Sequence, residues 1–569
     1  MTNPTPAAAP DPARWLAELM ANPLSPTHFL GIDNPASSLA ALPMPMPMFM
    51  PWPEATNAFV QWQQQAFQQM VAMSPWAGAP TDDRRFAGEA WHQGPAYDAV
   101  ARTYLMQSEQ VHKALDAAPL AAREKAQWAF VLRQVVDALS PANALMTNPE
   151  ALRSAVDSGG ASLAEGLRLF MQDLAKGRVS MTDDSAFEVG RNVATTPGNV
   201  VFENELMQLV QYAPSTARVH KRPLLIVPPC INKFYILDLQ PDNSFVAHAV
   251  GQGHTVFLVS WRNVGPEQQG LGWDDYLEHG VMQAIDVARE ITGADRVNTL
   301  GFCVGGTLLA SALAVLASKR EQKVASVTLL TTMLDFIDTG ELGLLISEQS
   351  VAAHEREIGR GGMLRGRELA QVFAALRAND LIWPYVINGY LKGKAPPAFD
   401  LLFWNGDDTN LPGPMFCWYL RNTYLENKLS EPGATVQCGV PVDLGAIELP
   451  AFLYASREDH IVPWQTAYAS TRLLGGDDIT FVLGGSGHIA GVINPPAKKK
   501  RNHWVGSIEP AAGDWLAGAR DVPGSWWPEW IAWLKPNAGA MVAAPASAGN
   551  RRHAVIEPAP GRYVKAKAP

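Results

Sequence analysis

Apolar positions follow one spacing before about residue 180 and another after about residue 185. In 97–115 (YDAVARTYLMQSEQVHKAL) and 125–139 (KAQWAFVLRQVVDAL), apolar residues recur every three or four positions without strand-like alternation. This spacing is typical of amphipathic helices and predicts a mainly helical N-terminal domain over 56–184. The Gln-rich stretch at its start, 57–73, is expected to be a packing or dimerisation face.

After about residue 185, short apolar runs alternate with helical patterns such as 273–293 and 305–319. Near-continuous apolar strands that alternate with helices predict a parallel sheet with helices on both faces. The six runs expected as strands are 223–229, 255–261, 297–302, 327–333, 451–456 and 479–485.

The alternation is interrupted between about 335 and 449, where helical segments surround a passage rich in Trp, Asn, Gly and Pro, 403–420. An insertion of this kind commonly covers the carboxyl ends of the strands, where ligands bind. We therefore expect 335–449 to be a cap within a catalytic domain spanning 185–569. Residues 1–55, rich in Pro, Ala and Met, are expected to be flexible, with an adhesive role for the Pro/Met repeat 43–53 as the alternative.

The charge balance narrows the possible functions. The chain carries 45 Lys and Arg against 55 Asp and Glu, a formal net charge of −10. A nucleic-acid partner is not expected, because phosphate backbones are bound by clustered positive charge. Charged residues make up only 18 % of the chain, below the roughly 25 % of typical soluble domains. We therefore expect a sticky surface, to which the 18 tryptophans would contribute.

The sequence shows no signal for export, membrane insertion or metal binding. The N-terminus lacks a basic start and an apolar stretch, and the longest apolar helical run, 307–318, is shorter than the roughly 20 residues of a membrane span. No Cys-x-x-Cys pair, Walker motif or HExxH motif occurs. We therefore expect a cytoplasmic protein with reduced thiols, no transmembrane segment and no metal.

One pentapeptide is a candidate for catalysis. Gly301-Phe302-Cys303-Val304-Gly305 has the pattern Gly-x-Cys-x-Gly, follows an expected strand and opens an expected helix. In this position the pattern is typical of a nucleophile elbow, the sharp strand-to-helix turn of the α/β-hydrolase fold. The chain is thus expected to combine an α/β-hydrolase fold and its cap with the preceding helical domain. The alternative is an inert buried cysteine in the same turn.

A thiol nucleophile needs a base beside it at neutral pH. In this fold the acid and then the histidine follow the nucleophile along the chain, each just after a later strand. Asp459 follows the fifth expected strand, and His488 lies on a Gly-rich loop after the sixth. Cys303, Asp459 and His488 are therefore the expected catalytic residues. Asp459 is preferred to Glu458 because Asp-x-x-Val-Pro at a strand end fits the acid turn.

The oxyanion hole is expected from two backbone N–H groups. One belongs to Val304, directly after the nucleophile, and the other to Ile231, in the loop after the first expected strand. Cys230 adjoins that loop, whereas Cys417 and Cys438 are expected to be structural.

Seven longer motifs lie in the second part of the chain. They are PPCINKFYILDLQP (228–241), QGHTVFLVSWRN (252–263), GFCVGGTLLA (301–310), FWNGDDTNLPGP (403–414), SREDHIVPW (456–464), GGSGHIAGVINPPAKKKRNHW (484–504) and EPAPGRYVKAKA (557–568). Together they resemble class I polyhydroxyalkanoate synthases. The resemblance covers roughly 185–569, and the helical N-terminal part fits more loosely.

The resemblance implies an acyltransferase that polymerises (R)-3-hydroxyacyl-coenzyme A, such as the 3-hydroxybutyryl thioester, and releases coenzyme A. Cys303 would carry the growing chain as a thioester, His488 would be the general base, and Asp459 would help to activate the substrate hydroxyl. Asn232 and His460 would lie beside the substrate path. The resemblance also implies a homodimer on cytoplasmic polymer granules, with granule-associated proteins as further partners and no cofactor apart from the coenzyme A of the substrate.

Two other functions remain open at the level of sequence. A thiol-dependent esterase or depolymerase would use the same three residues, and a non-catalytic granule-associated protein would need only a sticky surface. The run 515–534, which holds five tryptophans, is expected to pack as a final helix, with granule or partner contact as the alternative.

Overall fold

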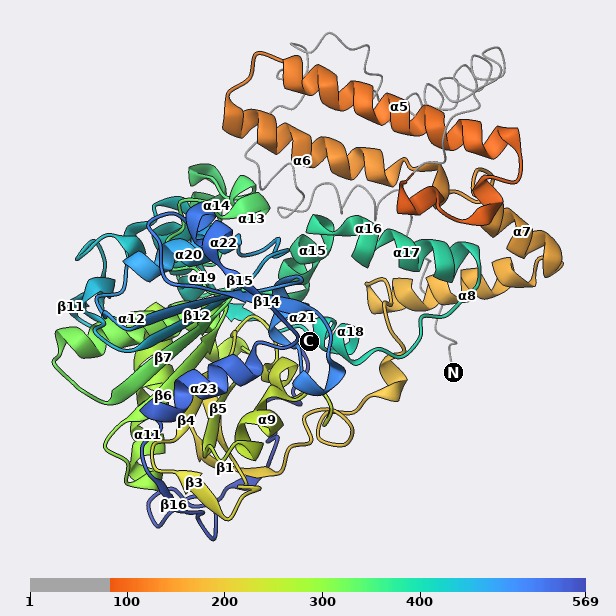
Figure 1. The fold of residues 1–569 in the computed structure, drawn as a ribbon. Coiled ribbons are helices and arrows are strands. Elements are labelled where there is room, and N and C mark those ends of the chain that lie inside the picture. The colour runs from red at the N-terminus through yellow and green to blue at the C-terminus, as the bar shows by residue number, and fades with distance from the viewer. Residues whose placement is uncertain (1–81, 569) are drawn as a thin grey trace, which may run out of the picture. The chain divides into compact units, whose positions relative to one another are not determined.

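The computed structural model describes residues 82–568 and divides them into two compact units. The first, the helical unit, contains the described residues up to Thr182 together with Val372–Pro397. The second, the catalytic unit, contains Asp183–Gln371 together with Ala398 and the residues after it. Figure 1 shows the chain coloured from its N-terminal to its C-terminal end.

This division regroups the segments expected from the sequence. The segment 335–449, expected as one cap, contributes 372–397 to the helical unit and its remaining parts to the catalytic unit. The expected flexible segment 1–55, with its Pro/Met repeat, and the Gln-rich stretch 57–73 lie outside the described residues. The predictions for those stretches therefore stay predictions.

The helical unit consists mainly of helices, which confirms the prediction from the spacing of its apolar residues (Figure 1). Its helices are α5 (Pro95–Ala117), α6 (Ala122–Ala138), α7 (Pro149–Asp157), α8 (Ala161–Lys176), α16 (Ala378–Leu381) and α17 (Trp383–Val386). Helices α5 and α7 both begin with proline, whose missing N–H is tolerated at a first helical position. The Asn148 side chain caps α7 by accepting from the N–H groups of Glu150 and Ala151.

The returning stretch 372–397 packs directly on α8. At Gly166 a Cβ atom would come within 2.0 Å of the carbonyl oxygen of Tyr390, so only glycine allows the two backbones to approach this closely. The Tyr390 hydroxyl donates to Asp173, also on α8, at 2.8 Å. These contacts explain why a segment expected in the cap belongs to the helical unit.

The catalytic unit is built on an 11-stranded sheet. In sheet order its strands are β15 (Arg520–Pro523), β14 (Asn502–Val505), β13 (Ile479–Gly484), β12 (Ala451–Ser456), β7 (Val324–Leu330), β6 (Val297–Phe302), β4 (Leu224–Val227), β5 (Val256–Trp261), β2 (Met207–Tyr212), β1 (Gly198–Glu203) and β17 (Glu557–Pro558). The six runs expected as strands form its parallel middle, from β13 to β5. The strands that flank this middle pair antiparallel and were not expected.

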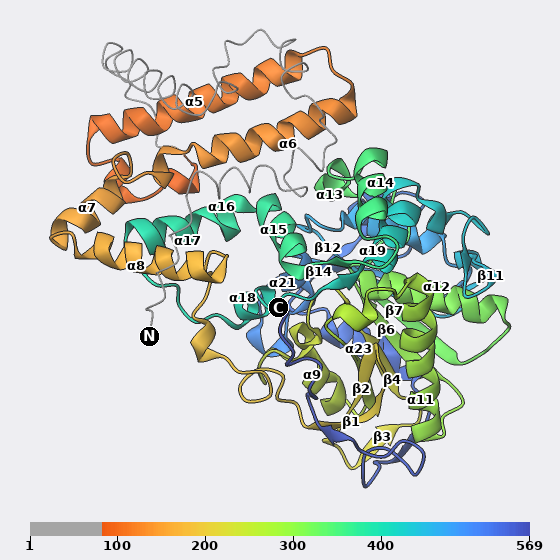
Figure 2. The same cartoon turned by 180° about the vertical axis from the view of Figure 1, so that it is seen from behind.

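Helices cover both faces of this sheet (Figures 1 and 2). On β4, Leu225 and Val227 join one hydrophobic core, whereas Leu224 and Ile226 join the other, as the two-residue repeat of a strand requires. The first core is shared with α11 (Gln283–Thr292) and α12 (Val304–Ser318), and the second with α9 (Phe245–Gly251) and α23 (Trp527–Asn537). Within 82–568, no helix is long and apolar enough to span a membrane.

The remaining elements of the catalytic unit are short. The helices of the catalytic unit between β7 and β12 are α13 (Gly340–Leu344), α14 (Glu348–Glu357), α15 (Gly366–Leu376), α18 (Asp400–Asn405) and α19 (Gly413–Tyr419). Of these, α15 extends into the stretch 372–397. Further helices outside the residues between β7 and β12 are α10 (Trp273–Asp275), α20 (Trp464–Ala469), α21 (His488–Val492) and α22 (Ala512–Gly518). Two-stranded pairs are formed by β3 (Arg218–His220) with β16 (Met541–Ala543), β8 (Met363–Leu364) with β9 (Leu411–Pro412), and β10 (Val436–Gln437) with β11 (Val440–Pro441).

The tryptophans of the described residues lie inside the protein. Trp515, Trp526, Trp527 and Trp530 are fully buried, and no tryptophan within 82–568 is exposed. The expected packing of the run 515–534 is therefore confirmed, but the run is not one helix, because it spans the end of α22, the strand β15 and the start of α23. The expectation of a tryptophan-rich surface is wrong for this part of the chain, because the rings fill the core between the sheet and its helices.

We expect Trp530→Ala to lower the free energy of unfolding by about 3–5 kcal/mol, because it empties a large buried site. The Trp530 side chain is 0 % exposed, and its indole N–H donates to the Thr328 hydroxyl at 3.0 Å. Trp533 is only half-buried on the same helix, so Trp533→Ala is the matched control and should cost less. Urea unfolding followed by circular dichroism measures both, and equal losses would contradict this assignment.

Candidate active site

Cys303 occupies the turn between β6 and α12. Its φ of +52° places a non-glycine residue in a sparsely populated region of backbone conformation. The turn is held by hydrogen bonds, because the Cys303 N–H donates to the carbonyl of Leu330 at 2.9 Å and the Gly306 N–H donates to the carbonyl of Cys303 at 2.8 Å. A strained conformation fixed by its surroundings is typical of a functional site.

Two glycines make this turn possible. A Cβ atom at Gly301 would lie 2.4 Å from the Cα of Gly306. A Cβ atom at Gly305 would lie 2.4 Å from the carbonyl oxygen of Val227 and 2.5 Å from that of Pro228. The first turn of α12 therefore packs directly on the end of β4 and on the loop that follows it. The elbow expected from Gly-x-Cys-x-Gly is present with the glycines in the positions that need them.

His488 and Asp459 meet after β13 and β12. The Nδ1 of His488 lies 2.6 Å from an Asp459 carboxylate oxygen, and the two side chains are 5 % and 0 % exposed. The other Asp459 oxygen accepts from the backbone N–H groups of Ile461 and Val462 at 2.8 and 2.9 Å. Both oxygens are thus occupied, which fixes the carboxylate in one orientation. The adjacent Glu458 is exposed, so the geometry favours Asp459 as the partner of the histidine.

The charges around His488 change its pKa. Burial alone would lower the pKa, but the negative charge of Asp459, the charge of Cys303 and hydrogen bonds to both raise it to about 10. The structure therefore brings Cys303, His488 and Asp459 together. Since folding raises this pKa, protonation of His488 stabilises the protein fully below about pH 6.5, and this contribution is lost as the pH rises towards 10.

The other three cysteines lie in different surroundings. All four cysteines are free thiols. Burial raises the pKa of Cys417 and of Cys438 to about 12, and it raises that of Cys230 further still, with a contribution from the neighbouring Cys303. Raised pKa values make these thiols poor nucleophiles. Within the described residues, no group of three or more His, Cys, Asp and Glu side chains is arranged to hold a metal ion.

The loop expected to complete an oxyanion hole, Pro228–Lys233, lies against the elbow. Its Ile231 is half-buried against the core, and Asn232 forms an isolated bridge with Asp408. The carbonyl oxygen of Pro228 accepts from the indole of Trp261 at 2.9 Å. The loop is thus adjacent to the first residues of α12, which include Val304. His460 is half-buried directly after Asp459.

Comparison with known proteins shows the family of this chain. Residues 82–249 match the family described as the poly-beta-hydroxybutyrate polymerase (PhaC) N-terminus, and residues 223–495 match the alpha/beta hydrolase fold. The poly(3-hydroxyalkanoate) polymerase subunit PhaC of Cupriavidus necator is 58 % identical over 508 residues, covering 88 % of this chain and 86 % of that protein. The chain belongs to the poly(3-hydroxyalkanoate) polymerase family. It is therefore an acyltransferase enzyme, and a non-catalytic role is not supported.

Two further polymerases of this family show similar coverage. The subunit of Rhizobium meliloti is 42 % identical, covering 86 % of this chain and 81 % of that protein. The polymerase of Methylorubrum extorquens is 43 % identical, covering 88 % and 83 %. The resemblance stated from the sequence motifs is thus confirmed, as is the α/β-hydrolase fold.

Two tyrosines that the sequence did not single out lie near Cys303. Tyr419 ends α19, and Tyr424 follows it in a π-helical segment, Leu420–Leu425. Burial raises the pKa of both phenols, the charge of Cys303 adds to the shift, and the two phenols hydrogen-bond to each other. The ring of Phe336 packs on both, with centroids 6.1 and 5.0 Å away. No local spacing rule marks such residues, because their position depends on how the inserted segment folds back.

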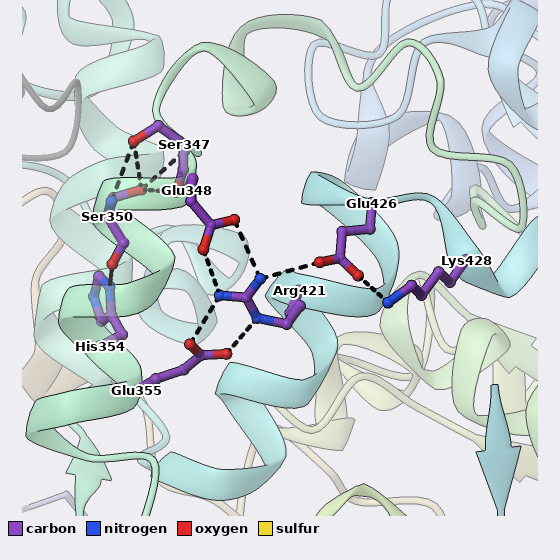
Figure 3. A network of polar contacts seen from close by, with 8 residues as sticks. All are labelled: Ser347, Glu348, Ser350, His354, Glu355, Arg421, Glu426 and Lys428. Atoms are coloured by element: carbon purple, nitrogen blue, oxygen red, sulfur yellow. Dashed lines mark hydrogen bonds and ion pairs between the residues drawn. The ribbon is translucent and has the colours of Figure 1, made fainter. Parts of the chain in front are cut away.

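Arg421 lies in the same π-helical segment as Tyr424 and forms a network of ion pairs (Figure 3). Its guanidinium binds Glu355 and Glu348 of α14, in each case with a contact of 2.9 Å, and Glu426 at 3.0 Å. Lys428 pairs with Glu426 in turn. The network joins α14 to the π-helical segment that carries Tyr424 and directly follows Tyr419.

Replacement of Asp459 tests its interaction with His488 directly. In Asp459→Asn, the pKa of His488 should fall from about 10 to near or below the ordinary 6.5. Burial lowers this pKa, and the negative charge of Asp459 that raises it would be absent. An NMR titration of the ring signals, assigned with His488→Gln, measures this shift. The neighbouring exposed carboxylate provides the control, and Glu458→Gln should leave the pKa unchanged. The same pKa in Asp459→Asn and wild type would refute the coupling.

Arg421→Met should lower the free energy of unfolding by about 1 kcal/mol, since these partly exposed ion pairs are screened by water. It should also lower polymerase activity, because the support of Tyr419 and Tyr424 is lost. Chemical denaturation and coenzyme A release measure the two effects. Arg356→Met on the exposed face of α14 removes the same charge and should change neither. Equal behaviour of the two variants would argue against a supporting role for the network.

Proposed function

We propose that this chain polymerises (R)-3-hydroxyacyl-coenzyme A, with 3-hydroxybutyryl-coenzyme A as the expected substrate, and releases coenzyme A. The observation that carries the proposal is the placement of Cys303 on a strained turn beside His488, which is itself hydrogen-bonded to Asp459. A positioned base beside a thiol is what nucleophilic acyl transfer requires. Coenzyme A enters as part of the substrate, and no further cofactor is proposed.

In the first half of the reaction, Cys303 attacks the thioester carbonyl of the substrate. His488 lies beside Cys303 and accepts the thiol proton as the sulfur attacks, which its raised pKa favours. The backbone N–H groups of Val304 and Ile231 stabilise the negative charge that develops on the carbonyl oxygen. The bond to coenzyme A breaks, the departing thiolate takes the proton of His488, and the acyl group remains on Cys303 as a thioester.

In the second half, the hydroxyl group of another 3-hydroxyacyl-coenzyme A attacks that thioester. An ester bond forms, the bond between the acyl group and the Cys303 sulfur breaks, and the lengthened chain on coenzyme A returns to Cys303 through the first half. Acylation removes the charge of Cys303, which is one cause of the raised pKa of His488. The imidazole is then a better match for a general base, and it accepts the proton of the attacking hydroxyl. Both carboxylate oxygens of Asp459 are hydrogen-bonded, which orients His488, and Asp459 is also proposed to help to activate the attacking hydroxyl, as the resemblance implies.

Asn232 and His460 are proposed to line the path of the acyl group and coenzyme A. Asn232 lies in the loop beside α12, and His460 directly follows Asp459, so each flanks one part of the site. The tyrosine pair Tyr419–Tyr424 is proposed to cover Cys303 and to keep water from its thioester. Exclusion of water favours chain growth over hydrolysis.

The protein is proposed to act as a homodimer in the cytoplasm, on the surface of its polymer granules and together with granule-associated proteins. Exposed apolar side chains in the helical unit support a surface contact of this kind. Met146, Val156, Leu167 and Met171 are 73 %, 71 %, 61 % and 53 % exposed. They, rather than the buried tryptophans, are the candidates for contact with an apolar surface.

Coenzyme A release from 3-hydroxybutyryl-coenzyme A, combined with product analysis, tests this function. Cys303→Ala should lower release by at least about a thousandfold, because it removes the nucleophile. Cys417→Ala, which changes another buried thiol, should keep most of the activity. Insoluble polyester as the product supports the proposal. Soluble 3-hydroxy acid from the wild type would instead indicate a thiol-dependent esterase or depolymerase.

A further inference from the structure

The C-terminal segment, Glu557–Ala568, runs along the catalytic unit from the edge of the sheet. It begins as β17, where Glu557 and Pro558 pair with β1. The Tyr563 hydroxyl then donates to the carbonyl of Asn204 at 2.8 Å, and the guanidinium of Arg262 lies 5.3 Å from the centre of the Tyr563 ring. Val564 is buried in the core. Both ribbon views place the C-terminal end beside α18 (Figures 1 and 2).

Beyond Val564, the segment reaches the end of the loop Pro228–Lys233. Lys233 is only 2 % exposed, and its ammonium donates to the carbonyl oxygen of Ala566 at 2.7 Å. Its own carbonyl accepts from the indole of Trp404, on α18, at 2.6 Å. A buried ammonium is costly unless it is hydrogen-bonded, so the tail carbonyl is a necessary partner. Lys233 lies two residues after Ile231.

A second contact joins the C-terminal segment, through Asp407, to Tyr235, which follows the loop. The Lys567 ammonium forms an ion pair with Asp407 at 3.0 Å and lies 5.3 Å from the ring centre of Phe403. The Asp407 side chain is 1 % exposed, and its other oxygen accepts from the Tyr235 hydroxyl at 2.9 Å. Burial lowers the pKa of Lys233 to about 8, although Asp407 opposes that shift, which places these charged groups in one cluster.

We propose that the C-terminal segment holds the loop Pro228–Lys233 in place, with Lys233 as a positioning residue and Lys567 as its second anchor. The start of α12 packs on the first part of the loop at Gly305, and the C-terminal segment secures its last part. The backbone N–H of Ile231 lies between these two supports. The inference rests on the proposed function, in which that N–H binds the oxyanion.

Precise placement is needed because an oxyanion donor acts only at hydrogen-bond distance from the developing charge. A displacement of about 1 Å in a catalytic group lowers rates by as much as a hundredfold. Loss of either anchor should therefore slow acyl transfer and leave substrate binding nearly unchanged. A merely structural segment would instead affect stability without a selective fall in kcat.

The test compares two lysines of the same segment in the full chain. Lys567→Ala removes the ion pair to Asp407, and its side chain is 61 % exposed, so the variant is expected to fold. Lys565→Ala removes the same charge at an exposed position and is the control. For Lys567→Ala we expect a fall in kcat of about threefold to tenfold with KM within about twofold, smaller than for complete loss of an oxyanion donor. Backbone deuterium exchange over 228–235 should become faster, whereas Lys565→Ala should match wild type in both.

A second variant addresses the first anchor. Lys233→Met keeps the length of the side chain and removes its hydrogen bond to Ala566, and kcat should fall by about tenfold to a hundredfold. If Lys233→Met does not fold, Lys567→Ala alone decides. Unchanged deuterium exchange over 228–235 in Lys567→Ala would overturn the inference, whether the enzyme forms polyester or soluble acid. Faster exchange with an unchanged kcat would support the anchoring but refute Ile231 as the oxyanion donor, so the two proposals fail separately.

Discussion

The contact between the first turn of α12 and the end of β4 governs the geometry of the whole site. No side-chain atom fits between Gly305 and the carbonyl groups of Val227 and Pro228. The strand-to-helix turn is consequently sharp, and Cys303 at its tip adopts a positive φ. The same contact places the loop after β4 beside the N-terminal residues of α12. One steric constraint thus positions Cys303 and the two candidate oxyanion donors at once.

Burial and charge then act together on the polar residues around this turn. Asp459 has no exposed side-chain surface, and its charge, together with Cys303 and the hydrogen bonds to both, outweighs the effect of burial on the pKa of His488. Elsewhere the same principle holds the surroundings in place: Arg421 joins the carboxylates of the inserted segment, and Lys233 is held by the C-terminal segment. Asp459, Arg421 and Lys233 each have a partner that is distant in sequence, so the site depends on the fold of the catalytic unit.

The sequence predicted the middle of the sheet well and its edges poorly. The parallel strands are buried on both faces and therefore appear as continuous apolar runs, whereas β2 carries the buried polar residues Gln208 and Gln211. Cys303, His488 and Asp459 could be predicted because each follows a strand in a fixed chain order. The tyrosine pair and the contact of Lys233 with Ala566 could not, since they depend on packing between residues far apart in sequence. Tryptophan content likewise indicated a sticky surface, but within 82–568 no tryptophan is exposed and most of the rings are buried in the core.

The central claim is that Cys303 carries the acyl chain as a thioester. Mass spectrometry of the wild-type enzyme, quenched in acid shortly after mixing with limiting 3-hydroxybutyryl-coenzyme A, tests it most directly. The account predicts one or more 3-hydroxybutyryl units on the peptide that contains Cys303, removable by hydroxylamine, and none on the peptide that contains Cys230. Coenzyme A release without acylation of Cys303, or with the acyl group on Cys230, would contradict the account.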